Sequence, residues 1–183
     1  MLKAHYFFAL SLSLETKHCI HKWTQPMKDE GSFQSWVHPG DYHITLAFLG
    51  SADELQPVIH KVDALNCPSF SLTLDHYGTF GKSDSPRILW MGVKPSEILQ
   101  RVRDSVYGAC EDAGFQLDKR PFSPHITVGR KWNRDFPFTS EWLNSFQPPH
   151  THLFTAREIV LYRTHVDRLP KYEAIYTKPL HAN

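Results

Sequence analysis

The hydrophobic residues of this chain follow two different spacings, which predict strands and helices in alternation. Where apolar residues alternate with polar ones, or form short runs rich in aromatic and β-branched side chains, a period of two predicts a β-strand. Such segments begin near Tyr6 and recur at residues 36–49, 70–74, 88–93 and 125–128. The pattern therefore predicts an α+β protein with several short strands.

Three segments have the 3.6-residue spacing of an amphipathic helix. Residues 15–25 form the first. The second is expected after Ser51, which is positioned to form a capping box with Glu54. The third covers residues 96–113 and ends at Gly114, because glycine commonly follows the last turn of a helix.

The remaining segments are expected to be irregular. Residues 77–87 contain two glycines and a proline and predict a surface loop. Residues 131–155 are rich in aromatic residues and prolines, with one short helix expected near residues 141–146. No tract is long or biased enough to be a linker, so residues 1–183 are expected to form one domain.

One tripeptide, His-Ile-Thr, occurs twice in predicted strands, at residues 43–45 and 125–127. Because successive side chains on a strand point to opposite faces, His43 and Thr45 share one face and the isoleucine between them faces the core. His125 and Thr127 are related in the same way. Two such strands facing each other would supply two imidazoles and two hydroxyls to one site.

Such a set of side chains suits acid–base chemistry at phosphorus. Imidazole has an unperturbed pKa of about 6.5, so both of its forms exist near neutral pH. One histidine can activate a nucleophile and the other can protonate the leaving oxygen, while the hydroxyls bind the non-bridging oxygens. The chain has 12 histidines, so a single His-x-Thr would be weak evidence. The repeat, with identical residues and the same polar–apolar parity, favours a catalytic role over coincidence.

Other catalytic classes lack their usual patterns. His150 and His152 have a chelating spacing, but they lie in a proline-flanked segment without a nearby cysteine, and most of the other histidines are scattered. We therefore expect no metal and no other cofactor. The sequence has no glycine-rich phosphate loop and no Gly-x-Ser-x-Gly motif, which disfavours magnesium-driven nucleotide hydrolysis and serine esterase chemistry.

The flanks of the two tripeptides carry a resemblance to a known family. Two segments resemble the signature motifs of the two-histidine phosphoesterases: Trp-Val-His-Pro-Gly-Asp-Tyr-His-Ile-Thr-Leu-Ala-Phe-Leu-Gly at residues 36–50 and Phe-Ser-Pro-His-Ile-Thr-Val-Gly-Arg at residues 122–130. Within that superfamily the chain is most similar to the bacterial RNA 2′,3′-cyclic phosphodiesterases of the LigT type, formerly described as 2′-5′ RNA ligases. Residues 6–10 resemble the first strand of that family, and residues 159–162 with 172–176 resemble its closing hairpin.

The resemblance implies a bilobal α+β fold. In it, two antiparallel sheets are related by a pseudo-twofold axis, with helices on the outside and a central active-site cleft. The expected order of elements is β-α-β-α-β-β-α-β-β-β, which contains two copies of a similar unit.

The resemblance also implies an activity, the metal-independent hydrolysis of RNA 2′,3′-cyclic phosphate ends to a 2′-phosphate. We expect His43 to be the acid that protonates the departing 3′-oxygen and His125 the base that activates water; the exchanged order stays open because the two motifs are related by pseudo-symmetry. Thr45, Thr127 and Arg130 would hold the phosphate oxygens. Two alternatives remain open: 2′-5′ RNA ligation, which is the reverse reaction at the same site, and a non-catalytic RNA-end binding module, against which the two intact histidines argue.

Arg130 requires a departure from regular strand geometry. It follows His125 by five positions, so strict alternation directs it to the opposite face, and a bulge at Gly129 would bring its guanidinium to a phosphate. The alternative is a solvated arginine at a strand end. By the same parity Phe48 faces away from His43 and is expected to pack in the core. Three other aromatic residues flank the motifs as candidates for stacking on a terminal base: Tyr42, Phe122 and Trp132.

Composition narrows the cellular setting. A formal net charge of +1 excludes a broadly basic surface that coats nucleic acid, so contact with RNA should be local and confined to a terminus. Three widely spaced cysteines indicate a reducing compartment. The apolar run at residues 6–14 is short and interrupted by serines, which favours a strand over a signal peptide. We expect a cytoplasmic monomer, without membrane association, that acts on RNA termini or on small nucleotides with a 2′,3′-cyclic phosphate.

Overall fold

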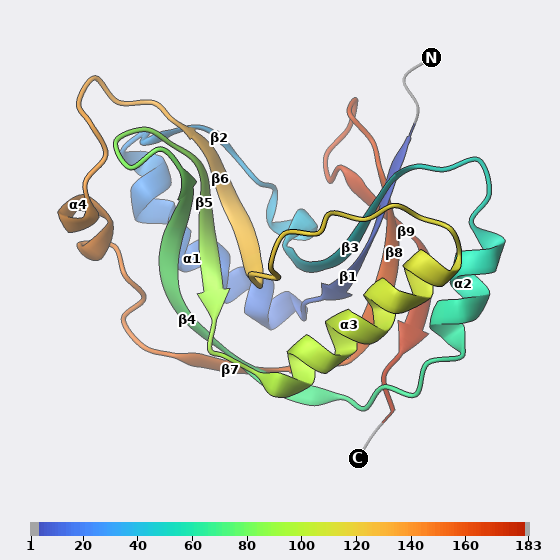
Figure 1. Cartoon of the computed structure of the whole chain (residues 1–183). Coiled ribbons are helices and arrows are strands. Elements are labelled where there is room, and N and C mark those ends of the chain that lie inside the picture. Colours follow the sequence, from blue (N-terminus) through green and yellow to red (C-terminus); the bar gives the residue numbers. More distant parts are fainter. Residues whose placement is uncertain (1–3, 182–183) are drawn as a thin grey trace.

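The computed structural model describes residues 4–181, which form two antiparallel sheets that lie side by side (Figure 1). The first sheet has the order β3-β1-β8-β9, with β1 at His5–Ser11, β3 at His43–Ser51, β8 at Glu158–Thr164 and β9 at Tyr172–Pro179. The second has the order β2-β6-β5-β4-β7, with β2 at Phe33–Trp36, β4 at Phe70–Gly81, β5 at Pro86–Val93, β6 at His125–Trp132 and β7 at His152–Ala156. The predicted α+β class with two antiparallel sheets is confirmed.

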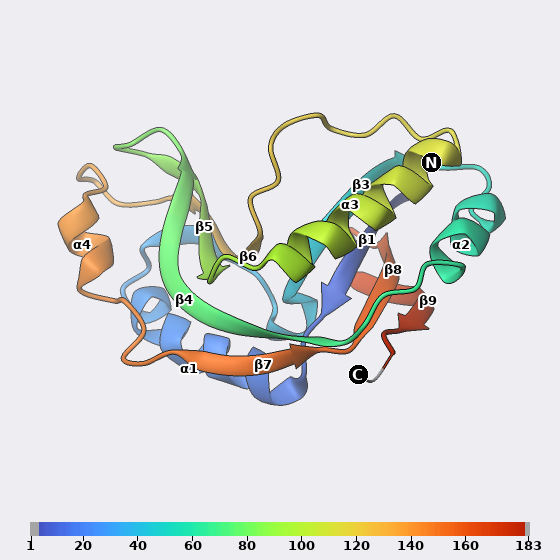
Figure 2. The same cartoon turned by 60° about the horizontal axis from the view of Figure 1, so that its bottom comes forward.

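The helices lie in the connections between strands, both between the two sheets and within the second sheet. They are α1 at Leu14–Asp29, α2 at Gln56–Asp63, α3 at Glu97–Asp112 and α4 at Ser140–Asn144, with a single 3₁₀ turn, η1, at Pro39–Asp41. Helix α1 follows β1 of the first sheet but packs against β7 of the second, whereas α3 follows β5 of the second sheet but packs against β3 of the first (Figure 2). Each long helix therefore covers the sheet opposite to the one that its preceding strand belongs to.

The ends of the two long helices follow from local chemistry. The Ser13 hydroxyl accepts a hydrogen bond from the Thr16 backbone N–H at 3.1 Å and caps α1. Ser96 caps α3 in the same way, with 3.2 Å to the Leu99 N–H. Gly114 follows α3 with φ = +90°, a conformation that glycine adopts without strain, and this confirms the predicted end of the helix.

Several predicted elements differ from those observed. The predicted loop at residues 77–87 is wrong, because β4 continues to Gly81 and β5 begins at Pro86. Gly78 is a strand residue that leaves room for the Trp90 indole, since a Cβ at Gly78 would lie 2.3 Å from that ring. The predicted capping box is also wrong, because α2 begins at Gln56 without a side-chain cap.

Two short strands were missed and one short helix was found. Strands β2 and β7 form the two edges of the second sheet, and each pairs with one neighbour only. The predicted strand at residues 36–49 is interrupted by η1 and begins at His43. The short helix expected near residues 141–146 is α4. No helix within residues 4–181 has the length and hydropathy needed to cross a membrane.

Candidate active site

The fold brings the two His-Ile-Thr copies together. Strand β3 lies at the edge of the first sheet and contacts β6 of the second. Ile44 and Ile126 are each 0% exposed, as alternation predicts for residues that face the core. His43 and His125 are half-buried on the opposite faces of their strands and lie near enough that the charge of one opposes protonation of the other.

Backbone carbonyls orient both imidazoles in the same way. His43 Nδ1 donates a hydrogen bond to the carbonyl oxygen of Asp41 at 2.7 Å, and His125 Nδ1 donates to that of Ser123 at 2.7 Å. In each copy the carbonyl belongs to the residue two positions before the histidine. This contact places the proton of the neutral ring on Nδ1 and leaves Nε2 as the atom that can accept or deliver a proton.

Aromatic side chains enclose both histidines and favour their neutral forms. The His43 ring contacts Phe7, at 4.8 Å between ring centroids, and Tyr172, at 5.2 Å. Burial lowers the pKa of His43 to about 4 despite the bond to the Asp41 carbonyl. Burial also lowers the pKa of His125, whose ring meets Phe80 edge to face at 4.9 Å. A bound anion would oppose this effect and favour a protonated imidazole.

A bulge in β6 brings Arg130 to the site. The register slips by one residue between Thr127 and Gly129, and Val128 and Gly129 are both buried. Arg130 consequently lies on the same face as His125, which confirms the expected bulge. The charge of Arg130 contributes to the lowered pKa of His125.

Strand β3 has a bulge at the equivalent place. The register slips between Thr45 and Ala47, so that Leu46 and Ala47 are both buried, at 3% and 4% exposure. The alternation of faces is therefore inverted after the bulge, and Phe48, which is 52% exposed, points to the same face as His43. The expectation that Phe48 packs in the core was therefore wrong. Phe48 occupies, in the first copy, the position that Arg130 occupies in the second.

Asp41 and Tyr172 belong to the site but were not among the candidates from the sequence, although both lie in segments that resemble the family. The buried Asp41 carboxylate accepts hydrogen bonds from the backbone N–H groups of Lys171 and Tyr172, at 2.9 and 3.0 Å. This joins the turn before β3 to the start of β9 and places the Tyr172 ring against His43. Burial raises the pKa of the Tyr172 hydroxyl, and the nearby Arg130 guanidinium counteracts the increase. The two lobes therefore meet at Arg130 and Tyr172.

The two threonines differ in their contacts. The Thr45 hydroxyl lies 3.0 Å from His43 Nε2 and lines the central cavity. Thr127 is half-buried on the face of β6 that carries His125, and its hydroxyl has no hydrogen-bond partner within residues 4–181. All five residues singled out in the sequence thus lie on the facing surfaces of β3 and β6.

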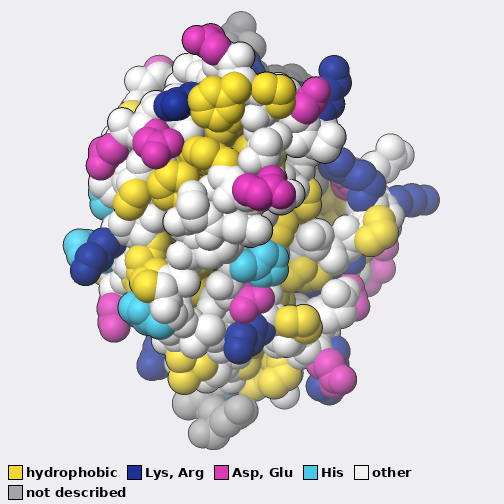
Figure 3. Space-filling view, turned by 90° about the vertical axis from the view of Figure 1, so that its left-hand side faces the viewer, with side chains coloured by type: hydrophobic (Ala, Val, Ile, Leu, Met, Phe, Trp, Pro, Cys, Tyr) yellow, Lys and Arg dark blue, Asp and Glu magenta, His cyan; other side chains and the backbone are white. Residues whose placement is uncertain are grey.

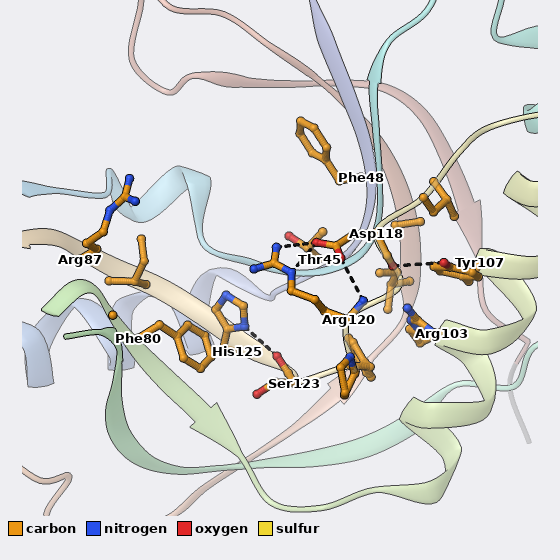
Figure 4. A pocket seen from close by; sticks show the side chains of 17 residues that line it. Thr45, Phe48, Phe80, Arg87, Arg103, Tyr107, Asp118, Arg120, Ser123 and His125 are labelled. Carbon is orange, nitrogen blue, oxygen red and sulfur yellow. Dashed lines mark hydrogen bonds and ion pairs between the residues drawn. The ribbon is translucent and has the colours of Figure 1, made fainter. Parts of the chain in front are cut away.

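A cavity of about 690 Å³ opens beside the motif strands (Figure 4). At one end it is lined by Thr45, Phe48 and His125, and towards the other end it reaches α3 and the loop at residues 113–124. Its volume lies within the range of about 300–1,000 Å³ typical of small-molecule sites. It can therefore hold more than a phosphate group.

Of the three aromatic residues proposed for base stacking, only Phe122 lines this cavity. Tyr42 is 2% exposed and belongs to the core. Trp132 packs within an aromatic cluster, 4.8 Å from the Trp142 ring, and its indole N–H donates to the Phe136 carbonyl oxygen at 2.8 Å.

His150 and His152, whose spacing could chelate a metal, make ordinary packing contacts. His150 lies edge to face with Trp23 at 5.2 Å, and His152 Nε2 lies 3.2 Å from the Thr16 hydroxyl. Residues 4–181 contain no group of three or more His, Cys, Asp or Glu side chains arranged to hold a metal ion. The three cysteines are free thiols.

Comparisons with known proteins agree with this geometry. The model of the 2′-5′ RNA ligase superfamily matches residues 18–168. The RNA 2′,3′-cyclic phosphodiesterase of Geobacillus stearothermophilus is 45% identical over 98% of this chain, which spans 58% of that protein. The enzyme of the same name from Bacillus subtilis is 35% identical, with 96% of each chain covered.

The fold has close counterparts among solved structures. The crystal structure of Escherichia coli LigT complexed with 3′-AMP superposes with a TM-score of 0.80 and 24% identity, covering 96% of this chain and 97% of that one. The family match covers most of the chain, and the relatives named above match it nearly end to end. The chain therefore belongs to the 2′-5′ RNA ligase superfamily.

Proposed function

We propose that this protein hydrolyses the 2′,3′-cyclic phosphate at RNA ends to a terminal 2′-phosphate, without a metal. The observation that carries this proposal is the pair of imidazoles on β3 and β6, each held at Nδ1 by a carbonyl 2.7 Å away so that Nε2 is left for proton transfer. The names of the Geobacillus and Bacillus relatives agree with it.

The reaction is an in-line displacement at phosphorus. His125 Nε2 takes a proton from water as the water oxygen bonds to phosphorus. The bond from phosphorus to the 3′-oxygen breaks, and His43 Nε2–H delivers a proton to that oxygen. Thr45, Thr127 and Arg130 bind the non-bridging oxygens and stabilise the charge that develops on them.

The two roles agree with the different surroundings of the histidines. His43 is the more completely enclosed ring, and its pKa of about 4 makes its protonated form the stronger acid towards a departing alkoxide. Burial lowers the pKa of His125 as well, which keeps its Nε2 unprotonated and available as the base. Since burial favours the neutral form of both rings, the anionic substrate has to supply the interaction that protonates His43.

Phe48 supplies a platform for the terminal base. Its ring lines the cavity and is 52% exposed, so a base can reach it. Stacking on an aromatic ring recognises any base, because every base has a π-face.

The surface charge suits recognition of an end rather than a duplex. On the side of the molecule that carries α4, Lys and Arg side chains are interspersed with Asp and Glu (Figure 3). With a formal net charge of +1, few phosphates can be neutralised along a strand. We infer a monomer that acts on RNA termini in the cytoplasm, and sizing of the purified protein in solution tests the oligomeric part.

The test is incubation of the purified protein with an oligonucleotide that ends in a 2′,3′-cyclic phosphate, in the presence of EDTA. We expect a product with a terminal 2′-phosphate. A product with a 3′-phosphate would contradict the assignment of the leaving oxygen, and loss of activity in EDTA would contradict the metal-free reaction. Adding an oligonucleotide with a 5′-hydroxyl to the same mixture measures ligation.

A further inference from the structure

A second group of cationic and aromatic side chains shares the cavity with His125 (Figure 4). Arg103 and Tyr107 project from α3, and Arg120 and Phe122 come from the loop that precedes β6. In Figure 4 Arg103, Tyr107 and Arg120 lie on the side of His125 away from Arg87. None of them takes part in the acid–base reaction.

Arg103 is held in an unusual environment for a cation. Its side chain is 15% exposed, and its guanidinium lies 4.0 Å from the centroid of the Tyr107 ring and 5.3 Å from that of Phe122. Its one hydrogen bond within residues 4–181 runs from Nη1 to the Asp104 carboxylate at 3.1 Å, and its Nε is buried without a partner. A largely buried charge with most of its donors unused is costly unless a ligand completes it.

Arg120 adds a second cation that is free to move. Its Nε donates to Asp118 at 2.7 Å, but the Arg120 side chain is 87% exposed and that of Asp118 is 52% exposed. An ion pair this exposed contributes little, so Arg120 can exchange Asp118 for an anionic ligand. Arg103 and Arg120 also line a neighbouring cavity together with Lys119. In the main cavity the two arginines share the lining with one acidic side chain, Asp118, while Glu111 lines the neighbouring cavity.

We propose that Arg103 and Arg120 bind the internucleotide phosphate on the 5′ side of the terminal nucleotide. The proposal rests on the proposed function, which places the cyclic phosphate at His43 and His125. The cavity of about 690 Å³ is lined by His125 and Thr45 as well as by the two arginines, so a substrate whose cyclic phosphate lies at His125 can also reach the arginines. A guanidinium fits a phosphodiester, and the Tyr107 and Phe122 rings hold Arg103 in place. The enzyme is thereby built for an RNA end rather than for a free mononucleotide.

Three substrates test this proposal: a nucleoside 2′,3′-cyclic phosphate, a dinucleotide ending in the same group, and that dinucleotide with a neutral methylphosphonate in place of its internucleotide phosphate. The last two differ in one charge and little in shape. We expect the wild-type kcat/KM to be about tenfold higher for the charged dinucleotide, the effect of one charge-assisted hydrogen bond. Equal values for the two dinucleotides would overturn the subsite, and this comparison needs no variant.

Variants then identify the residues. Arg103→Gln should bring the ratio between the charged and neutral dinucleotides close to one, and Arg120→Gln should reduce it. Arg101→Gln is the matched control, because Arg101 lies on the same helix, is 74% exposed and lines neither cavity, so the wild-type ratio should persist. A wild-type ratio in both Arg103→Gln and Arg120→Gln would overturn the assignment.

Hydrolysis of the mononucleotide separates this inference from the proposed function. If the mononucleotide is hydrolysed and the two dinucleotides are equivalent, only the subsite is wrong. If none of the three substrates is hydrolysed, the proposed function is wrong, and the proposed subsite is then wrong as well.

Discussion

Burial of His43 should make the folded protein lose stability as the pH falls below 6.5. The folded pKa of His43 is about 4, against about 6.5 in an unfolded chain. Between these values the unfolded chain binds a proton that the folded protein does not, so acid favours unfolding. The stabilising contribution of neutral His43 is complete above pH 6.5 and is lost as the pH falls towards 4.

The size of this effect follows from the shift. One pKa unit corresponds to about 1.4 kcal/mol, so the full shift corresponds to about 3 kcal/mol, of which about 2 kcal/mol is already lost at pH 5. Most domains are stable by only about 5–15 kcal/mol, so a change of this size is measurable. Replacing His43 by glutamine removes the titrating group and keeps a polar side chain of similar length.

The assay is urea unfolding of the wild type and His43→Gln at pH 7.5 and at pH 5, followed by tryptophan fluorescence. Carboxylates and histidines distant from His43 titrate in both proteins, so their contribution cancels in the difference. We expect the wild type to lose about 2 kcal/mol more than the variant between the two pH values. Equal losses, or a larger loss in the variant, would refute the reasoning, and so would a His43 pKa near 6.5 in an NMR titration.

The remaining predictions concern the reaction. His43→Ala and His125→Ala should each lower kcat by ~10²- to 10⁴-fold, and the double variant should be only slightly worse, because the two residues act as a unit; near wild-type turnover in either single variant would exclude the two-histidine mechanism. The pH dependence of kcat/KM should be bell-shaped, whereas a rate that keeps rising into alkali would indicate a metal hydroxide. Thr45→Val and Thr127→Val should each cost ~1 to 3 kcal/mol of transition-state stabilisation while the fold is retained. If kcat/KM is unchanged in both valine variants, the threonines serve only to form the strands. Arg130→Lys should also lower kcat/KM, because lysine cannot make the two parallel hydrogen bonds of a guanidinium. A cyclic substrate with sulfur in place of the 3′-oxygen needs no protonation of its leaving group. It should therefore restore most of the turnover of His43→Ala but not that of His125→Ala. The opposite pattern would show that His125 is the acid and His43 the base.

The features of the site that depend only on residues close in the sequence were predicted correctly from side-chain alternation and backbone conformation. The alternation of side chains placed each histidine on the face of its threonine and each isoleucine, both 0% exposed, in the core. The helix-ending role of Gly114 needed only its own φ of +90°. These features follow from interactions within a few residues, which are present in the sequence itself.

The face to which side chains beyond the two tripeptides point could not be predicted from alternation. Both motif strands contain a bulge one residue after the threonine, and this bulge directs Phe48 and Arg130 into the cleft. In β6 the glycine at position 129 indicated that a bulge could form, but Leu46 and Ala47 in β3 did not indicate one. A bulge depends on how two strands pair, and so its position is determined by the partner strand rather than by the strand's own residues.

Long-range contacts decided the rest. The edge strands β2 and β7 are short segments that become strands because β6 and β4 offer them unpaired edges. Asp41 reaches the N–H groups of Lys171 and Tyr172 on another part of the chain, and through them it places Tyr172 against His43. The sequence by itself determined which groups can carry out the chemistry. Only the tertiary structure decided which of them meet and how far burial lowers the pKa of the two histidines, because enclosure by distant aromatic residues is a property of packing.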